Sequence, residues 1–230
     1  MADPRLLYFV SFRDNDGSYK TPWIGSNGFR DASGVPTFAA AAYNGYNTAR
    51  IQAPSNGIYS DTTTVEIPPE GCVECWVRLD GWSWSGTTVS NGVDKTVFGW
   101  RAANATPFLQ LAFANGNGLQ FYLTTGTPRI VNVTSQSFSD GEDVHLAISW
   151  KEDGANGLMK VYVNGAEVGS GTFDLGLTGS NQNGPNFGGL PTRDDRSIEG
   201  YLFNGKVWNY FKTDFSDRER PRAGLNDFGA

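Results

Sequence analysis

The sequence predicts an all-β protein: an antiparallel two-sheet jelly-roll sandwich with one short C-terminal helix. Apolar and polar residues alternate in many short segments, and clusters of Gly, Asn, Asp, Ser and Pro separate these segments. The dipeptide Asn164-Gly165, the strongest short signal for a hairpin turn, stands between two such runs. Glycine supplies 29 of the 230 residues and charged residues only 18%, a balance that suits strands joined by tight turns.

Ten segments have the residue types or the alternation expected of strands. They are residues 6–12, 63–67, 72–79, 96–100, 108–113, 119–124, 130–133, 144–150, 159–164 and 201–211. One helix is expected after Ser216, because Glu219 three residues later completes a capping-box pattern and Pro221 then stops the helix.

We expect one domain over residues 1–230, because no linker, repeat or shift in composition divides the chain. Short antiparallel strands in this number need two packed sheets to bury their apolar faces. Residues 1–59 are expected to contain a first strand and a loop-rich segment from about residue 25 to residue 56. Residues 219–230 are expected to form a C-terminal tail.

The charge and hydropathy of the chain exclude several classes of partner. A net charge of -6 disfavours nucleic acid, since phosphate binding needs a basic surface. The first twelve residues lack the pattern of a secretion signal, and no apolar window reaches the length of a membrane span. We therefore expect synthesis in a host cytoplasm and no membrane insertion.

Neither a redox pair nor a metal site is expected. Cys72 and Cys75 lie in a predicted strand, where residues three apart point to opposite faces, so they are interpreted as reduced structural thiols. His145 is the single histidine, which leaves too few ligands for zinc. The acidic loops at residues 14–17 and 194–199 have calcium-type ligands, but the first is also a turn signal and arginines flank the acids of the second. No metal or cofactor is predicted.

Three short motifs occur in the order found in a known family. They are Glu74-Cys75-Trp76-Val77, His145-Leu146-Ala147 and the hairpin Tyr162-Val163-Asn164-Gly165. Over about residues 60–218 the chain resembles the laminin-G-like modules of the concanavalin A-like lectin/glucanase superfamily, with a departure at Asn209, where those modules have an apolar residue. The resemblance implies the jelly-roll fold. It does not specify a function, because this superfamily includes lectins, adhesion modules, hydrolases and virion proteins.

Catalysis is not expected from the pattern of carboxylates. Retaining glycosidases of this fold place their carboxylates on one strand, so that acid and nucleophile project from the same face. Glu142-Asp143 and Asp194-Asp195 are instead adjacent residues, whose side chains point apart in an extended chain. A Gly-x-Ser-x-Gly nucleophile motif is absent from the sequence.

Aromatic residues in turn-like sequence are the main candidates for ligand binding. Trp82 and Trp84 are two residues apart and therefore on one side of an extended segment, where exposed rings could stack on sugars. Alternatively, this pair caps the edge of the sandwich or joins a protein interface. Trp23, Arg193 and Asp194 complete the candidate set.

Two functions remain from different classes. The first is a non-enzymatic structural and surface-recognition protein of a virus particle, such as a bacteriophage capsid-decoration, head-fibre or tail-associated subunit. It would sit on the virion surface in contact with other virion proteins and with copies of itself as a homo-oligomer. The alternative is a free-standing carbohydrate-binding lectin module, with a host surface glycan as partner. In both, the hairpin at Asn164-Gly165 is a scaffold element.

Overall fold

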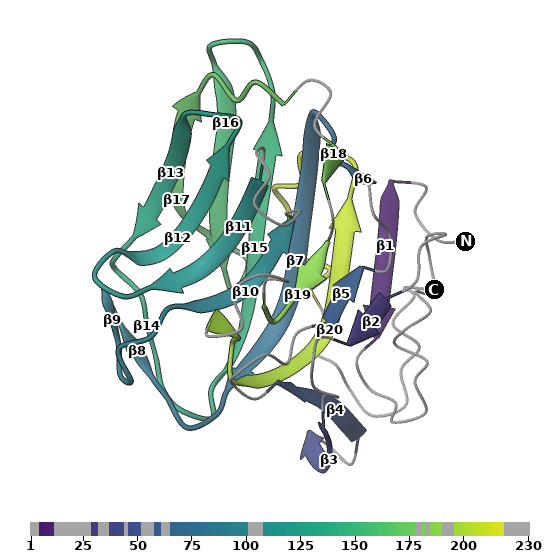
Figure 1. The fold of residues 1–230 in the computed structure, drawn as a ribbon, viewed down its shortest axis with the longest axis vertical. Helices are drawn as coiled ribbons and strands as arrows, with labels where there is room; N and C mark the ends of the chain where they lie inside the picture. Colours follow the sequence, from purple (N-terminus) through teal and green to yellow (C-terminus); the bar gives the residue numbers. More distant parts are fainter. Residues whose placement is uncertain are drawn as a thin grey trace.

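The computed structural model is a sandwich of two antiparallel β-sheets packed face to face (Figure 1). It describes residues 5–11, 29–31, 37–43, 46–51, 58–60, 65–100, 108–177, 181–182, 185–189 and 196–218. The predicted fold class is therefore confirmed.

The first layer is an eight-stranded sheet, here called sheet A. Its strands lie in the order β17 (Ala166–Phe173), β16 (Gly157–Val163), β15 (Asp143–Lys151), β7 (Glu70–Leu79), β20 (Gly200–Trp208), β4 (Tyr46–Ile51) and β3 (Thr37–Tyr43), with β1 (Leu6–Ser11) also paired to β20.

The second layer is a seven-stranded sheet, here called sheet B. Its order is β13 (Pro128–Val133), β12 (Gly118–Thr124), β11 (Phe108–Ala114), β10 (Lys95–Trp100), β19 (Asn186–Phe187), β5 (Ile58–Ser60) and β2 (Phe29–Asp31). Two small sheets complete the described structure: β14 (Ser137–Phe138), β8 (Trp84–Ser85) and β9 (Thr88–Val89) form one, and β18 (Asn181–Gln182) and β6 (Val65–Glu66) form the other.

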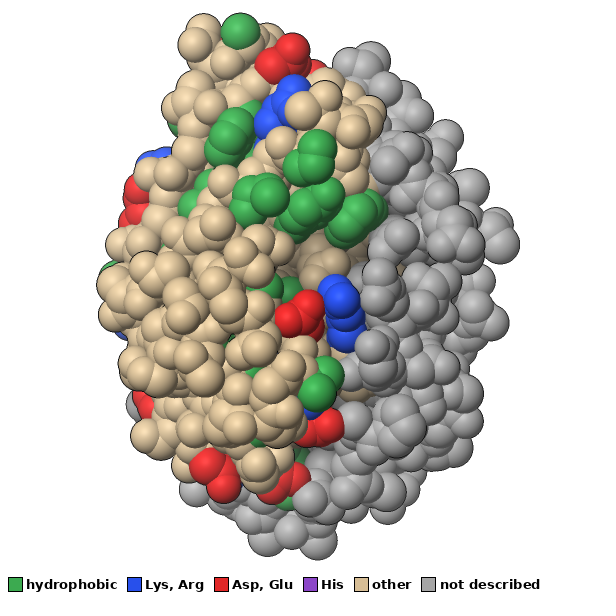
Figure 2. Space-filling view, turned by 60° about the vertical axis from the view of Figure 1, so that its left-hand side comes forward, with side chains coloured by type: hydrophobic (Ala, Val, Ile, Leu, Met, Phe, Trp, Pro, Cys, Tyr) green, Lys and Arg blue, Asp and Glu red, His purple; other side chains and the backbone are tan. Residues whose placement is uncertain are grey.

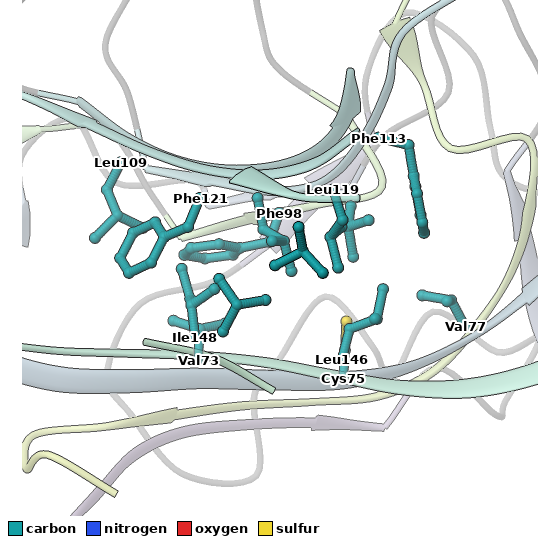
Figure 3. Packing of buried hydrophobic residues seen from close by; sticks show 14 of the residues in the cluster. Val73, Cys75, Val77, Phe98, Leu109, Phe113, Leu119, Phe121, Leu146 and Ile148 are labelled. Atoms are coloured by element: carbon teal, nitrogen blue, oxygen red, sulfur yellow. The ribbon is translucent and has the colours of Figure 1, made fainter. Parts of the chain in front are cut away.

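The main core lies between the two sheets, and the side-chain alternation of the strands fills it (Figure 3). Val73 and Ile148 project from sheet A toward Phe121 of sheet B, and each is at most 2% exposed. Burying a side chain of this size stabilises the fold by roughly 1.5–3 kcal/mol. The edges of the two sheets also meet, since β13 contacts β17.

The two cysteines lie on opposite faces of β7, as the sequence predicts. Cys75 belongs to the main core, whereas Cys72 belongs to a second apolar cluster on the outer face of sheet A, with Tyr162, Trp208 and Phe215. Both thiols are buried and free. Burial raises the pKa of Cys72 well above its usual range, with the Glu74 carboxylate as the next cause.

The segment expected to be loop-rich, from about residue 25 to residue 56, contains the strands β2, β3 and β4. Their partners β5 and β20 are distant in sequence, so the sequence alone does not show this pairing. The predicted C-terminal helix does not form over residues 216–218, which make a turn in which the Ser216 N–H donates to the Asp214 carboxylate at 2.9 Å. The described residues contain no helix with the length and hydropathy that crossing a membrane requires.

The last predicted strand ends earlier than expected, which accounts for the unusual Asn209. Strand β20 stops at Trp208, and Asn209 is exposed just beyond it. The Asn209 N–H donates to the carbonyl of Arg5 at 2.9 Å. A polar residue is therefore compatible with this position.

The turn between β16 and β17 supports the C-terminal segment as well as the hairpin. Asn164 and Gly165 have φ values of 50° and 82°, the left-handed pair that a tight two-residue hairpin turn requires. Asn164 donates its N–H to the His145 carbonyl at 2.8 Å and accepts the His145 N–H on Oδ1 at 3.0 Å. A Cβ at Gly165 would lie 2.6 Å from Cζ of Arg218, so the guanidinium packs directly against this turn.

This packing predicts that Gly165→Ala destabilises the protein more than Gly116→Ala. Gly116 has a similar φ of 85°, but a Cβ at this position would meet no atom within 4 Å. Gly116→Ala therefore lowers the free energy of unfolding only through the strain of a left-handed alanine, about 1–2 kcal/mol. For Gly165→Ala we expect a further loss of up to about 1 kcal/mol, because the Arg218 guanidinium must move. Urea unfolding measures both values. In an Arg218→Ala background the two substitutions should cost the same, and a persistent difference would contradict the role given to Arg218.

Candidate functional site

The outer face of sheet B carries aromatic rings and side-chain amides at neighbouring positions. Leu109 and Leu111 on β11 are buried in the core, so the alternate residues Phe108 and Gln110 point outward. Across the sheet, Gln110 lies opposite Tyr122 of β12. The outward residues of β11 and β12 therefore lie side by side.

The register of the strands places these outward residues in rows. Tyr122 is opposite Ile130, and Gln120 is opposite Asn132, to which its Nε2 donates a hydrogen bond at 3.0 Å. We call this surface the amide–aromatic face. It consists of Phe108, Gln110, Gln120, Tyr122, Ile130 and Asn132.

The aromatic part of this face is a stacked pair. The ring centroids of Phe108 and Tyr122 are 4.8 Å apart and their planes differ by 16°. Both rings are half-buried, and neighbouring Ile130 is 37% exposed. The pair stabilises the cross-strand contact and also leaves apolar ring surface in contact with solvent.

Figure 2 shows a group of hydrophobic side chains beside a hollow in the surface, with a basic and an acidic side chain together on the far side of the hollow. On the same side of sheet B as the amide–aromatic face, Gly99 lies opposite Gln110 and Ala112 lies opposite Thr96, and Gly99, Ala112 and Thr96 are buried. Just before β10, Asp94 Oδ2 pairs with Arg196 Nη1 at 3.1 Å.

Of the two interpretations of Trp82 and Trp84, the exposed surface for stacking on sugars is wrong. These two residues are only 2% and 1% exposed, and both belong to the main core. Trp82 donates its Nε1–H to the Glu199 carbonyl at 2.5 Å, and Trp84 stacks on Phe138 with centroids 5.4 Å apart. The sequence spacing places both rings correctly on one side of the segment, but that side faces the end of the core and not solvent.

The remaining predicted ligand and metal residues are only partly covered by the structure. Trp23, Arg193, Asp194 and residues 14–17 lie outside the described residues. Glu199, from the second acidic loop, is described, and its Oε2 is 2.8 Å from Lys95 Nζ and accepts from Asn91 Nδ2 at 3.2 Å. This carboxylate is therefore engaged by protein groups.

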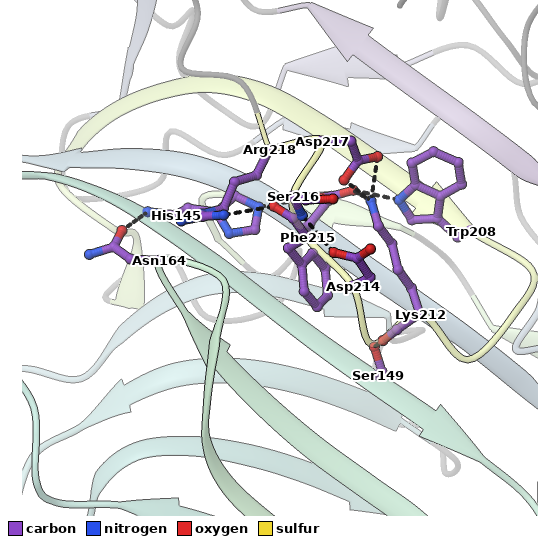
Figure 4. A network of polar contacts seen from close by, with 11 residues as sticks. His145, Ser149, Asn164, Trp208, Lys212, Asp214, Phe215, Ser216, Asp217 and Arg218 are labelled. Carbon is purple, nitrogen blue, oxygen red and sulfur yellow. Dashed lines mark hydrogen bonds and ion pairs between the residues drawn. The ribbon is translucent and has the colours of Figure 1, made fainter.

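The outer face of sheet A carries a buried cluster of charges (Figure 4). Glu74 is 3% exposed, and its Oε2 lies 2.8 Å from His145 Nε2. Its Oε1 accepts from Trp208 Nε1 at 2.7 Å and from Lys212 Nζ at 2.8 Å. Lys212 Nζ also pairs with Asp217 at 2.9 Å. Both carboxylate oxygens of Glu74 are thus occupied.

The charges of this cluster shift its pKa values in opposite directions. Burial alone would raise the pKa of Glu74. This effect is outweighed by the hydrogen bond and charge of His145 and by the charges of Lys206 and Lys212, which hold the pKa of Glu74 well below its usual range. Burial would lower the pKa of Lys212, but Glu74 and Asp217 outweigh it and raise that pKa. Both groups therefore remain charged at neutral pH.

The cluster attaches the C-terminal strap, defined as residues 209–218, to sheet A. Lys212 and Phe215 of the strap are 2% and 1% exposed, and Ser149 of β15 donates its hydroxyl to the Lys212 carbonyl at 2.5 Å. The Lys212 ammonium lies 4.4 Å from the centroid of the Trp208 ring. The strap thereby covers Cys72 and its apolar neighbours.

The Glu74 cluster predicts a loss of stability in acid. The pKa of Glu74 is lower in the folded protein than in the unfolded chain, where it is about 4.3. The ionised carboxylate therefore adds its full stability above about pH 4.3, and this stability is lost as the pH falls toward the folded-state pKa. Urea unfolding of the wild-type protein should lose about 2 kcal/mol more between pH 5 and pH 2 than that of Glu74→Gln. Equal losses in the two proteins would show that Glu74 does not supply this dependence.

The strap geometry further predicts that Lys212→Met exposes one cysteine selectively. In a Cys75→Ser background, we expect the labelling rate of Cys72 by a thiol reagent at pH 8 to rise at least about tenfold, because partial opening of the strap uncovers this side chain. The matched control is Lys212→Met in a Cys72→Ser background, where Cys75 should stay protected between the sheets. Equal acceleration at both cysteines would indicate global unfolding instead.

The amide–aromatic face is absent from the sequence-based candidates, although the strands that form it are predicted. The alternation of β11 and β12 identifies the core, and the outward positions of the same alternation, Gln110, Gln120 and Tyr122, are the signal that could have identified the face. The contribution of Ile130 and Asn132 depends on the pairing of β12 with β13, which only the folded structure shows.

Several solved structures share this fold. Domain 4 of AbnA, a GH43 extracellular arabinanase from Geobacillus stearothermophilus, solved in complex with arabinotriose, has a TM-score of 0.61 at 18% identity and covers 90% of this chain and 93% of its own. The binding domain of paraclostridial mosquitocidal protein 1 has a TM-score of 0.61 at 12% identity over 90% of this chain, which spans only 49% of that one. At these identities the likeness shows the fold alone.

The sequence profile gives a more specific result. The profile of the concanavalin A-like lectin/glucanases superfamily matches residues 47–214. No curated protein sequence matches the chain. The matched range covers most of the sequence and includes the three motifs on which the resemblance rests. The chain therefore belongs to the concanavalin A-like lectin/glucanase superfamily.

Proposed function

We propose that this protein is a non-enzymatic recognition module that binds carbohydrate on the amide–aromatic face of sheet B. The observation that carries this proposal is the stacked pair Phe108 and Tyr122 set beside the outward amides of Gln110 and Gln120. Sugars present apolar C–H surface and hydroxyl groups close together, and this face offers ring surface and amide hydrogen-bonding groups side by side.

The charges around the face favour a neutral sugar. The three amides, from Gln110, Gln120 and Asn132, can donate and accept but carry no charge. Arg129, on the same strand as Asn132, directs its guanidinium to the carbonyls of Asp174 and Thr127 at 2.7 and 2.8 Å. A neutral chain therefore meets complementary groups without the desolvation of a charge.

The similarity to domain 4 of the Geobacillus arabinanase supports the proposal. That domain was solved with arabinotriose, a neutral oligosaccharide, and the two chains cover each other almost completely. The likeness establishes a common fold, so the inference for this protein depends on its own aromatic and amide residues.

The distribution of carboxylates supports a non-enzymatic role. Hydrolysis by a retaining mechanism needs two carboxyl groups about 5–5.5 Å apart. Strands β11 to β13, which form the face, and the adjacent strand β10 contain no Asp or Glu. The acids of the adjacent pair Glu142-Asp143 are used elsewhere. Asp143 accepts two hydrogen bonds from Arg78, at 2.6 and 2.9 Å, and Glu142 accepts the Ser139 N–H at 2.8 Å.

A role in a virus particle stays a prediction from the sequence. A glycan-binding face is compatible with that role, because a virion surface subunit that binds a host glycan uses the same chemistry. Co-sedimentation of the protein with a purified particle tests the virion prediction, and sedimentation of the protein alone tests the predicted homo-oligomer.

The proposed function predicts saturable binding on an array of neutral oligosaccharides. We expect Tyr122→Ala to weaken that binding about tenfold, equivalent to ~1.4 kcal/mol, through loss of ring stacking. Titration calorimetry with the best array ligand measures the change.

The matched control is Tyr201→Ala, which removes a half-buried ring from sheet A. This variant should bind like the wild-type protein. Binding that survives Tyr122→Ala, Phe108→Ala and Gln110→Ala would move the site away from this face, and an array without any saturable ligand would refute the proposal.

A further inference from the structure

The side chains of the amide–aromatic face follow a repeating order. Each of its three strands contributes one apolar residue and one amide, two positions apart in the sequence. The pairs are Phe108 and Gln110 on β11, Tyr122 and Gln120 on β12, and Ile130 and Asn132 on β13. Because the neighbouring strands are antiparallel, the order of the pair is reversed on β12, and the three amides lie toward the same end of the strands.

The face therefore carries two parallel lines of side chains. The apolar line consists of Phe108, Tyr122 and Ile130, and the amide line consists of Gln110, Gln120 and Asn132. Each line takes one residue from each strand and so runs across the sheet. Two strand spacings and one two-residue step separate the ends of a line, roughly 12 Å in total. This span exceeds one sugar unit and accommodates two or three linked units.

Burial limits the face in the other direction, along the strands. On β12, the central strand of the three, the next outward residues on either side of Gln120 and Tyr122 are Gly118 and Thr124, and both are buried. The exposed surface of this strand is therefore one two-residue step wide, roughly 7 Å. The longer direction of the face lies across the strands.

The amide line keeps hydrogen-bonding capacity for a ligand. The bond from Gln120 Nε2 to Asn132 Oδ1, at 3.0 Å, uses one donor of Gln120 and one acceptor of Asn132. Gln120 Oε1 can still accept, and Asn132 Nδ2 can still donate. A sugar hydroxyl group both donates and accepts, so it can use either atom. The bond also orders the two amides before a ligand arrives, which lowers the entropy lost on binding.

We propose that the amide–aromatic face binds a linear oligosaccharide lengthwise across β11, β12 and β13, with apolar C–H surface of successive units on the apolar line and their hydroxyl groups on the amide line. This inference rests on the proposed function, to which it adds the direction and the length of the bound chain. A single sugar reaches only part of either line. Each further unit reaches the pair on the next strand, until the pair on β13 is occupied.

The dependence of affinity on chain length tests this arrangement. The probes are four neutral ladders of one to four linked units, made of β-1,4-linked glucose, mannose or xylose or of α-1,5-linked arabinose, each titrated by calorimetry. In the ladder that binds best, we expect affinity to rise about tenfold from one unit to two, where the second stacked ring is reached, and about fivefold from two units to three. From three units to four the change should stay below about twofold, because the lines end at β13.

The outcomes of these titrations separate this inference from the proposed function. Equal affinity for one and for three units, still weakened by Tyr122→Ala, would overturn the lengthwise arrangement and leave carbohydrate binding on this face intact. Affinity that keeps rising beyond three units would also overturn it. The absence of saturable binding in all four ladders would overturn this inference, whereas the proposed function is decided by the wider array.

A substitution on β13 tests which unit lies at the end of the lines. Ile130→Ala combined with Asn132→Ala should weaken binding of the trisaccharide about fivefold, to the affinity of the disaccharide. The disaccharide itself should bind like it does to the wild-type protein, because it occupies the pairs on β11 and β12 around the stacked rings. Its retained binding also shows that the variant is folded.

The matched control is Thr127→Ala, an exposed residue of the turn before β13, which should bind both ligands like the wild-type protein. Asn132→Ala alone, at an exposed position, should show the same selectivity for the trisaccharide to a smaller degree, about twofold. Equal weakening of the disaccharide and the trisaccharide in Asn132→Ala would overturn the assignment of β13 to the end unit.

Discussion

The fold depends on the alternation of side chains along β7, the strand that lies between β15 and β20 in sheet A. Its inward residues, such as Val73 and Val77, build the core against sheet B. Its outward residues Cys72 and Glu74 build the second apolar cluster and the charge cluster. A shift of β7 by one residue would place Glu74 between the sheets and Val73 under the strap, so one register fixes both layers.

The buried Glu74 carboxylate connects parts of the chain that are distant in sequence. His145 joins it from β15, Trp208 from β20 and Lys212 from the strap, while the hairpin turn at Asn164 holds the backbone of His145. Because removal of one partner leaves a buried charge uncompensated, such a cluster specifies a single arrangement even where its net contribution to stability is small. The hairpin thus serves as a scaffold for the strap.

The two outer faces of the sandwich have different chemistry. The amide–aromatic face of sheet B has neutral amides and ring surface, which suits a neutral sugar chain. The outer face of sheet A instead carries the buried charges of Glu74 and Lys212 beneath the strap. The core separates these two surfaces.

The sequence by itself determined the fold class, most of the long strands, the hairpin at Asn164-Gly165 and the opposite orientations of Cys72 and Cys75. These features depend on local alternation and turn chemistry, which are properties of neighbouring residues. The sequence also placed Trp82 and Trp84 on one side of their segment. Which side faces the core depends on Phe113 and Phe138 from other strands, and only the tertiary structure decided that. The same holds for the pairing of Phe108 with Tyr122, for the three partners of Glu74 and for the strap, because cross-strand register and long-range charge pairing arise from contacts between residues far apart in the chain.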